Sequence, residues 1–149
     1  KESKLLLREV ALIPVPLRDK RILVPRLPAI EDSSRFWSAA MVLEHLIIVG
    51  GQIKIVAQHL ARGETPPGVA DVAKVKPSGD LAGPVCLEQY KIFSDDFLKA
   101  IRSLRGDQWA TGTFNHPWFG PLTLHKWMCL AAIHQRIHRR QIEAIIRLL

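Results

Sequence analysis

The chain has 149 residues, of which 48% are hydrophobic and 23% are charged. This length and balance suit one domain with a hydrophobic core, residues 1–149, and exclude both two ordinary domains and a wholly disordered chain. The formal net charge of +7 fits either a nucleic acid or an anionic small molecule as partner, so the placement of the charges has to decide between them.

The two cysteines, Cys86 and Cys129, are too few for a disulfide framework or a thiolate metal site. We therefore expect reduced thiols and a cytoplasmic protein of bacterial type. His, Gln or Lys residues interrupt the strongest apolar stretches, and we expect none of these stretches to be long enough to cross a membrane. The N-terminal Lys-Glu-Ser-Lys lacks the layout of a secretion signal.

The first half of the chain predicts two helices. Apolar side chains at positions 5–7, 10 and 12 can form one short helix, and prolines at 14, 16, 25 and 28 prevent anything longer. From Ser38, whose hydroxyl can cap a helix, apolar residues recur at spacings of four and three as far as Leu60. This pattern predicts a helix over about residues 38–61, in which Gly50 and Gly51 mark a close helix contact or a bend.

The second half predicts two more helices and two loops. Residues 62–86 are rich in glycine and proline and predict a long loop without a helix or strand of its own. A third helix is expected from the N-cap Ser94 to Gly106, followed by an aromatic loop over residues 114–121. A last helix is expected from the N-cap Thr123 to the C-terminus. Four helices joined by long loops predict an all-α four-helix bundle, with any metal site between facing helices.

The last predicted helix carries two of its histidines on the apolar side. With about 100° per residue and His134 at zero, His138 lies at about 40° and Trp127 near 20°. His125 lies about 180° away and is expected to be exposed. An unpartnered buried polar group costs about 1–3 kcal/mol, so inward-facing imidazoles need partners. Two histidines one turn apart can chelate one metal ion. Alternatively, they are core residues whose ring nitrogens find hydrogen-bond partners in the protein, or they are surface residues.

A third metal ligand has to come from another helix, and the helix over residues 38–61 offers two histidines. His45 lies about 60° from Val42, at the edge of the apolar stripe, whereas His59 lies about 100° from it. The two histidines are about 21 Å apart by helix rise, so one ion cannot reach both. The periodicity favours His45 over His59.

Four stretches resemble the motifs of one family. Residues 37–46, Trp-Ser-Ala-Ala-Met-Val-Leu-Glu-His-Leu, resemble the second-helix motif of the DinB/YfiT-like superfamily. Three further stretches resemble the fourth-helix motif of that superfamily. They are His-Pro-Trp-Phe-Gly-Pro-Leu-Thr at 116–123, His-Gln-Arg-Ile-His at 134–138 and Gln-Ile at 141–142. The resemblance implies a DinB-like bundle that holds a divalent metal ion, most often zinc or nickel, on His45, His134 and His138.

Relatives in that superfamily include transferases that join low-molecular-weight thiols to electrophiles, and they often pair through bundle faces. The resemblance therefore implies a small-molecule substrate such as a thiol, and a homodimer. Three neutral histidines would also leave one coordination position open to water or substrate, as in catalytic zinc sites. We predict a thiol-dependent S-transferase or a related metal-dependent hydrolase, with its catalytic residues unassigned.

The alternative is a non-catalytic metal- or ligand-binding bundle. It is favoured by the lack of an evident general base, because Glu44 points about 100° away from His45 and should be solvated. Gln141 lies near −20° on the helical wheel, measured from His134. It is either a hydrogen-bond partner of a ligand histidine or a residue at a solvated end of the bundle. His116 either lines a pocket mouth or is simply exposed. For Trp118 and Phe119 we expect core packing in preference to the wall of an apolar pocket.

Arginines on the opposite side of the last helix make nucleic acid a third candidate partner. Such a run is usually a solvated face, and aromatic residues do not interleave with it as single-strand binding requires. We therefore expect no nucleic-acid binding, and a solvent-exposed row formed by Arg136, Arg139, Arg140 and Arg147.

Overall fold

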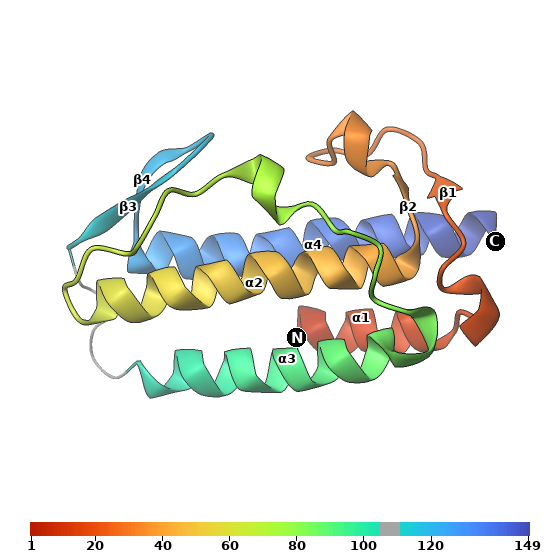
Figure 1. The fold of residues 1–149 in the computed structure, drawn as a ribbon, viewed down its shortest axis with the longest axis horizontal. Helices are drawn as coiled ribbons and strands as arrows, with labels where there is room; N and C mark the ends of the chain where they lie inside the picture. The colour runs from red at the N-terminus through yellow and green to blue at the C-terminus, as the bar shows by residue number, and fades with distance from the viewer. Residues whose placement is uncertain (105–110) are drawn as a thin grey trace.

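Four α-helices form a bundle within residues 1–104 and 111–149, which the computed structural model describes (Figure 1). They are α1 (Glu2–Ala11), α2 (Ala39–Ala61), α3 (Gly83–Ser103) and α4 (Leu124–Leu148). α2 packs against α3 and α4, and α1 packs against the same two helices. The predicted all-α four-helix bundle is confirmed, although two short antiparallel strand pairs accompany it.

The long connection between α2 and α3 is a crossover. These two helices run in the same direction in Figure 1, so residues 62–82 return along the whole of α2, about 35 Å for its 23 residues. On the way the chain forms a short 3-10 helix, η3 (Val72–Val75). The predicted loop is therefore correct as far as residue 82, except that it contains one helical turn. The high glycine and proline content of the segment gave no indication of that turn.

The predicted start of the third helix is wrong. α3 begins at Gly83, with Pro84 in its first turn, where the missing amide proton of proline costs nothing. Ser94 is buried in the middle of the helix, and its hydroxyl donates to the carbonyl of Lys91 at 3.0 Å. A serine hydroxyl can find its hydrogen-bond partner in the preceding turn of its own helix, so the presence of a serine does not by itself mark the start of a helix. The predicted stop, Gly106, lies outside the described residues.

The two strand pairs flank the bundle. β1 (Ile22–Leu23) pairs with β2 (Phe36–Trp37), and the 3-10 helices η1 (Val15–Leu17) and η2 (Asp32–Ser34) lie in the same N-terminal region. β3 (Thr113–His116) pairs with β4 (Gly120–Thr123), with His116 opposite Gly120. The predicted aromatic loop is therefore a hairpin. Thr123 does stand at the N-cap of α4, but its side chain makes no capping hydrogen bond.

The core is divided into two apolar clusters along α2 and α4. One cluster contains Val42 and Leu46 of α2 with Ile142 and Ile145 of α4, together with residues of α1. The other contains residues of the second half of α2, such as Ile53, with the first half of α4. On α4, His134 and His138 lie between the residues of the two clusters, whereas His45 of α2 lies within the stretch that supplies the first cluster.

α2 is longer and more apolar than we expected of any stretch in this sequence. Its 23 residues have a best-window mean hydropathy of 1.6, so by length and composition this helix could cross a membrane. The expectation that no apolar stretch is long enough was wrong, since a few polar residues do not offset so many aliphatic ones. Half of that window is buried inside the protein, where α2 contributes to both core clusters. The apolar character of α2 is therefore explained by its central place in the bundle.

Gly50 and Gly51 have different roles in α2. The Cζ atom of Phe93 on α3 lies only 2.2 Å from where a Gly50 Cβ would be, whereas a Gly51 Cβ would meet nothing within 4 Å. Phe93 cannot turn aside freely, because the rings of Tyr90 and Phe97 lie 6.1 and 5.9 Å from it. Gly50 therefore marks the close contact between α2 and α3.

Gly50→Ala and Gly51→Ala should separate helix propensity from packing. Both variants gain about 1 kcal/mol of helix propensity, but Gly50→Ala also overpacks Phe93 at a cost of about 1–3 kcal/mol. Chemical denaturation should therefore rank Gly51→Ala as the more stable of the two, by about that cost. Equal free energies of unfolding would show that α2 and α3 are not in close contact there.

Arg139 is not part of a solvated row. Its guanidinium donates to Glu2 and Glu9 of α1, at 2.9 Å each, and to Glu143 one turn along α4. These hydrogen bonds raise the pKa of Arg139, whereas burial raises the pKa of Glu9. The helical wheel could not reveal that α1 covers this side of α4. Arg136, Arg140 and Arg147 are exposed, as expected.

Candidate metal centre

The three predicted histidines meet between α2 and α4. His45 extends from α2, and His134 and His138 extend from successive turns of α4. One ring nitrogen of each lies within 4.8 Å of the others, and the Nε2 atoms of His45 and His134 are 3.2 Å apart. Two imidazoles bonded to one tetrahedral zinc ion at about 2.0–2.1 Å would have their nitrogens about 3.3 Å apart. The cluster could therefore hold a metal ion.

Hydrogen bonds fix the tautomers of two of these histidines. Nδ1–H of His45 donates to the carbonyl of Val75 at 2.7 Å. Nδ1–H of His138 donates to Oε1 of Gln141 at 2.8 Å, and Nε2 of Gln141 donates to the carbonyl of Ser34 at 2.7 Å. A carbonyl can only accept, so each of these imidazoles keeps its proton on Nδ1 and leaves the Nε2 lone pair available to a metal.

Gln141 thus proves to be a hydrogen-bond partner of a predicted ligand, and it does not lie at a wet bundle end. Its side chain is fully buried. Its amide orientation is also determined, because Nε2 has to face the Ser34 carbonyl and Oε1 is left to face His138.

Burial keeps all three imidazoles neutral. Burial is the main cause of the lowered pKa of His45 and of His138. It also lowers the pKa of His134, to about 3. The neighbouring imidazoles lower the pKa of His134 and His138 further, since two adjacent positive rings repel each other. Trp37 covers the cluster, with its ring 5.0 Å from His45 and stacked at 6.1 Å on His138. Three neutral imidazoles that converge, two of them buried and His134 half-buried, fit the needs of a divalent first-row metal.

The metal-free protein should lose stability in acid because of these histidines. Their pKa values are lowered in the folded state, so below about pH 6.5 the unfolded chain binds more protons and unfolding is favoured. Each histidine contributes at most about 1.4 kcal/mol per pH unit. Urea unfolding in chelator at pH 7 and pH 5.5 should show a smaller loss for His138→Leu than for wild type. An identical loss would show that His138 titrates normally.

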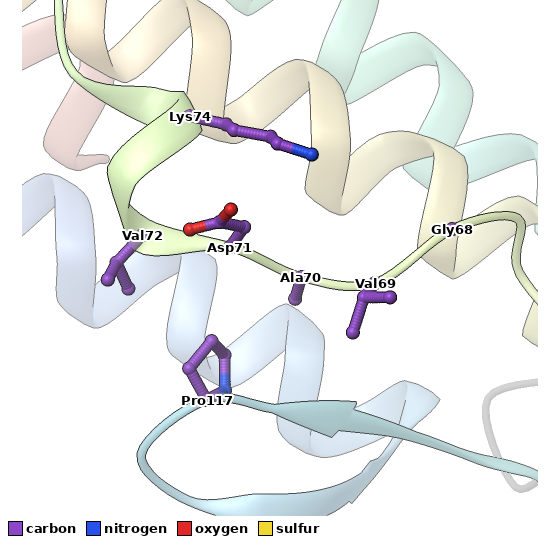
Figure 2. A pocket seen from close by; sticks show the side chains of 7 residues that line it. All are labelled: Gly68, Val69, Ala70, Asp71, Val72, Lys74 and Pro117. Atoms are coloured by element: carbon purple, nitrogen blue, oxygen red, sulfur yellow. The ribbon is translucent and has the colours of Figure 1, made fainter.

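A cavity of about 500 Å³ opens from the histidines to the surface. α2 and α4 form its floor, and the crossover segment and the β3–β4 hairpin form its walls. At its mouth is a recess of about 430 Å³, where Pro117 of the hairpin lies opposite Val69, Ala70 and Val72 of the crossover segment (Figure 2). The same residues also line the larger cavity, so the recess and the cavity are continuous.

Trp118 and Phe119 line this cavity and are each 59% exposed. The expectation that they pack in the core was wrong, because the hairpin turn that carries them projects beyond the bundle. His116 is half-buried and lines the cavity too, which favours the pocket interpretation of that residue.

Carboxylates that the sequence analysis missed also line the cavity. Glu31 raises the pKa of His45 against the effect of burial, and Asp71 caps η3 through the amide of Ala73 at 2.9 Å. With His116, they are the candidate proton carriers of the site. Both lie in connections between helices, which leave no periodic signal in the sequence.

Glu44 is not solvated as expected. Its carboxylate accepts hydrogen bonds from the amide and hydroxyl of Ser78, at 2.9 and 2.6 Å, and from the amide of Gly79 at 2.9 Å. These bonds fasten the crossover segment to α2, a few residues beyond the Val75 carbonyl that orients His45. Glu44 therefore anchors the segment that carries the Val75 carbonyl.

Glu44→Ala should weaken metal binding without touching a ligand. Loss of the anchor frees the Val75 carbonyl, and the loss of such an outer partner typically costs about 10–100-fold in metal affinity. A competition titration with a zinc chelator would measure the change, with Glu88→Ala on the exposed side of α3 as control. Equal affinities for both variants would contradict the link between Glu44 and His45.

The other histidines lie outside the cluster. Nδ1 of His59 donates to the carbonyl of Ile55 at 2.9 Å, in its own helix. His125 is exposed, as expected, and its Nε2 lies 3.6 Å from Sγ of Cys129. The structure thus brings His45, and not His59, together with His134 and His138. It forms no disulfide between Cys86, which is buried, and Cys129, which is exposed.

Comparison with known proteins agrees with this architecture. A crystal structure described as TT2238, a four-helix bundle protein, is similar to this chain with a TM-score of 0.61 and 22% sequence identity. The similarity covers 96% of this chain and 90% of the other, and it shows a shared fold. A search among curated proteins finds no match. The profile of the DinB superfamily matches residues 12–142, and the chain belongs to that superfamily.

Proposed function

We propose that this chain is a metal-dependent enzyme whose divalent ion, zinc or nickel, is bound by His45, His134 and His138. The observation that carries the proposal is the convergence of three neutral imidazoles at the floor of an open cavity. The outer hydrogen bonds to Val75 and Gln141 hold two of these rings in the tautomer that a metal requires. Such bonds are typical of metal-ligating histidines.

The reaction we propose is the attack of a low-molecular-weight thiolate on a small electrophile: a carbon–sulfur bond forms, the anionic leaving group departs and the thiol proton passes to solvent. Hydrolysis is the related alternative. A bound metal would supply a stabilised thiolate or a water of lowered pKa. Three neutral histidines leave the charge of the ion uncompensated, which favours an anionic ligand. A cytoplasmic location, where such thiols are abundant, agrees with cysteines that form no disulfide.

The test is a thiol-conjugation assay. Zinc- or nickel-loaded protein is incubated with a series of low-molecular-weight thiols and 1-chloro-2,4-dinitrobenzene, and the rate is corrected for the uncatalysed reaction. We expect turnover that disappears on chelation, returns with metal and is absent from His45→Ala. Metal-loaded protein that turns over none of these thiols, and hydrolyses no ester substrate, would contradict the enzyme proposal.

A non-catalytic binding protein is the second candidate. One observation favours it: within residues 1–104 and 111–149, no carboxylate hydrogen-bonds to the three histidines, and Glu31 is exposed. In that case ligand would bind to the metal-loaded protein without any chemical change.

We propose no nucleic acid or membrane as partner. Arg139 is engaged by three glutamates, which weakens the basic face of α4 as a binding surface. A homodimer is also part of the proposal. It is supported by Val85 and Ile92, which are exposed apolar residues two turns apart on α3. Sedimentation analysis would test it.

A further inference from the structure

Exposed apolar side chains gather around the mouth of the cavity. Val69 is 85% exposed, Trp118 and Phe119 are exposed, and Ile55 and Ile133 continue the same surface on α2 and α4. Scattered apolar residues on a surface need no explanation, but a contiguous set that lines a cavity marks a binding site. The volume of about 500 Å³ lies in the range of small-molecule pockets.

The two aromatic residues of the hairpin form a corner. The rings of Trp118 and Phe119 are nearly perpendicular, at 88° with centroids 6.5 Å apart. Aromatic rings bind one another in offset-stacked or edge-to-face arrangements, and a perpendicular corner offers a flat ligand one contact of each kind. Aliphatic ligands would gain only part of these contacts.

His116 adds a polar atom to this aromatic surface. Its ring stacks on Phe119 at 4.8 Å and lies 5.4 Å from Trp127. Its Nδ1 accepts a hydrogen bond from the backbone amide of Trp118 at 3.1 Å, so the neutral ring carries its proton on Nε2. Among the described residues, that Nε2–H has no hydrogen-bond partner. It is a donor of fixed tautomer in the wall of an apolar pocket.

We propose that Trp118, Phe119 and His116 form a subsite, separate from the three metal ligands, for a flat aromatic small molecule that carries a hydrogen-bond acceptor. The aromatic body lies in the corner of Trp118 and Phe119, and the acceptor receives the proton of His116 Nε2. This inference rests on the proposed function and deepens it, because it assigns the electrophilic partner of the thiol to aromatic compounds with a carbonyl, nitro or acidic group.

Two fluorescent probes of the same ring system test the subsite. 1-Anilinonaphthalene-8-sulfonate carries an acidic acceptor, and N-phenyl-1-naphthylamine has the same rings without it. Wild type should bind both probes saturably, at one per chain. Trp118→Ala should weaken both by about fivefold to tenfold, since a single aromatic contact contributes on that order. Phe36→Ala, at an exposed aromatic residue of β2, should change neither.

The donor is tested by His116→Phe, which keeps an aromatic ring but removes Nε2–H. It should weaken binding of the sulfonate and leave binding of N-phenyl-1-naphthylamine unchanged. Far-UV circular dichroism confirms that each variant is folded. Non-saturable binding, or equal effects of Trp118→Ala and Phe36→Ala, would overturn the subsite; equal effects of His116→Phe on both probes would overturn the donor role.

The same titrations distinguish the subsite from the metal centre. They are performed with zinc-loaded and with chelator-treated protein, and metal content is measured in each sample. Saturable probe binding by a protein that takes up no metal would contradict the proposed function and keep the subsite. Metal uptake without probe binding would contradict the subsite and leave the proposed metal centre intact.

Discussion

His138→Ala is expected to lower zinc affinity by more than about 100-fold. The loss of an outer hydrogen-bond partner alone costs about 10–100-fold, and this variant removes a ligand together with its bond to Gln141. The two remaining imidazoles, His45 and His134, would bind an ion from only two sides. Competition with a chelator of known affinity measures the change. His45→Ala should behave in the same way.

The control for these variants is His59→Ala. It removes an imidazole from the same helix as His45, at a position whose ring bonds only to its own helix. Its zinc affinity should equal that of wild type. If His138→Ala retained wild-type affinity while His59→Ala lost it, the assignment of the site would be wrong.

Gln141→Leu is expected to reduce both metal affinity and stability. The substitution keeps the volume but leaves Nδ1–H of His138 and the carbonyl of Ser34 without partners in a buried place. Unpaired buried polar groups cost about 1–3 kcal/mol in the free energy of unfolding. Metal affinity should fall by about 10–100-fold, because the His138 ring is free to rotate and to change tautomer.

Gln135→Leu separates these two effects. Gln135 is half-buried on the same helix, and its Oε1 accepts hydrogen bonds from Ser3 and Tyr90, away from the histidines. Its substitution should lower stability and leave zinc affinity unchanged. If Gln135→Leu weakened zinc binding as much as Gln141→Leu does, a general loosening of α4 would explain both results, and the specific role of Gln141 would be refuted.

Periodicity was sufficient to predict the helices that build the floor of the site. The spacing along α2 and α4 gives their extents and turns His134 and His138 inward, because the core selects apolar residues on one face. Ser38 is a true N-cap, accepting from the amide of Met41 at 3.1 Å. The choice of His45 over His59 was weaker, since both stand at the margin of the apolar stripe.

The surroundings of the metal ligands could not be predicted in the same way. His45 and Gln141 bond to the backbone carbonyls of Val75 and Ser34, which any residue type could supply. Glu44 fastens a segment 34 residues away in the chain. Such contacts depend on where the crossover and the N-terminal region pass over the bundle, and no pattern within one helix records that path.

The walls of the cavity were misjudged for a related reason. Trp118 and Phe119 are residues that usually pack in cores, but they lie in the turn of a β-hairpin that stands out from the bundle. Sequence composition predicts how much apolar surface a segment has. It does not predict whether the fold supplies a partner for that surface or leaves it open to a ligand.

The most direct test of the metal centre is a crystal structure of the zinc-loaded protein with diffraction data recorded on both sides of the zinc absorption edge. We expect one anomalous peak per chain, about 2.0–2.1 Å from Nε2 of His45, His134 and His138, with non-protein density completing the coordination on the cavity side. A zinc-loaded crystal whose anomalous peaks all lie elsewhere, with the three imidazoles bonded only to one another and to the protein, would contradict it.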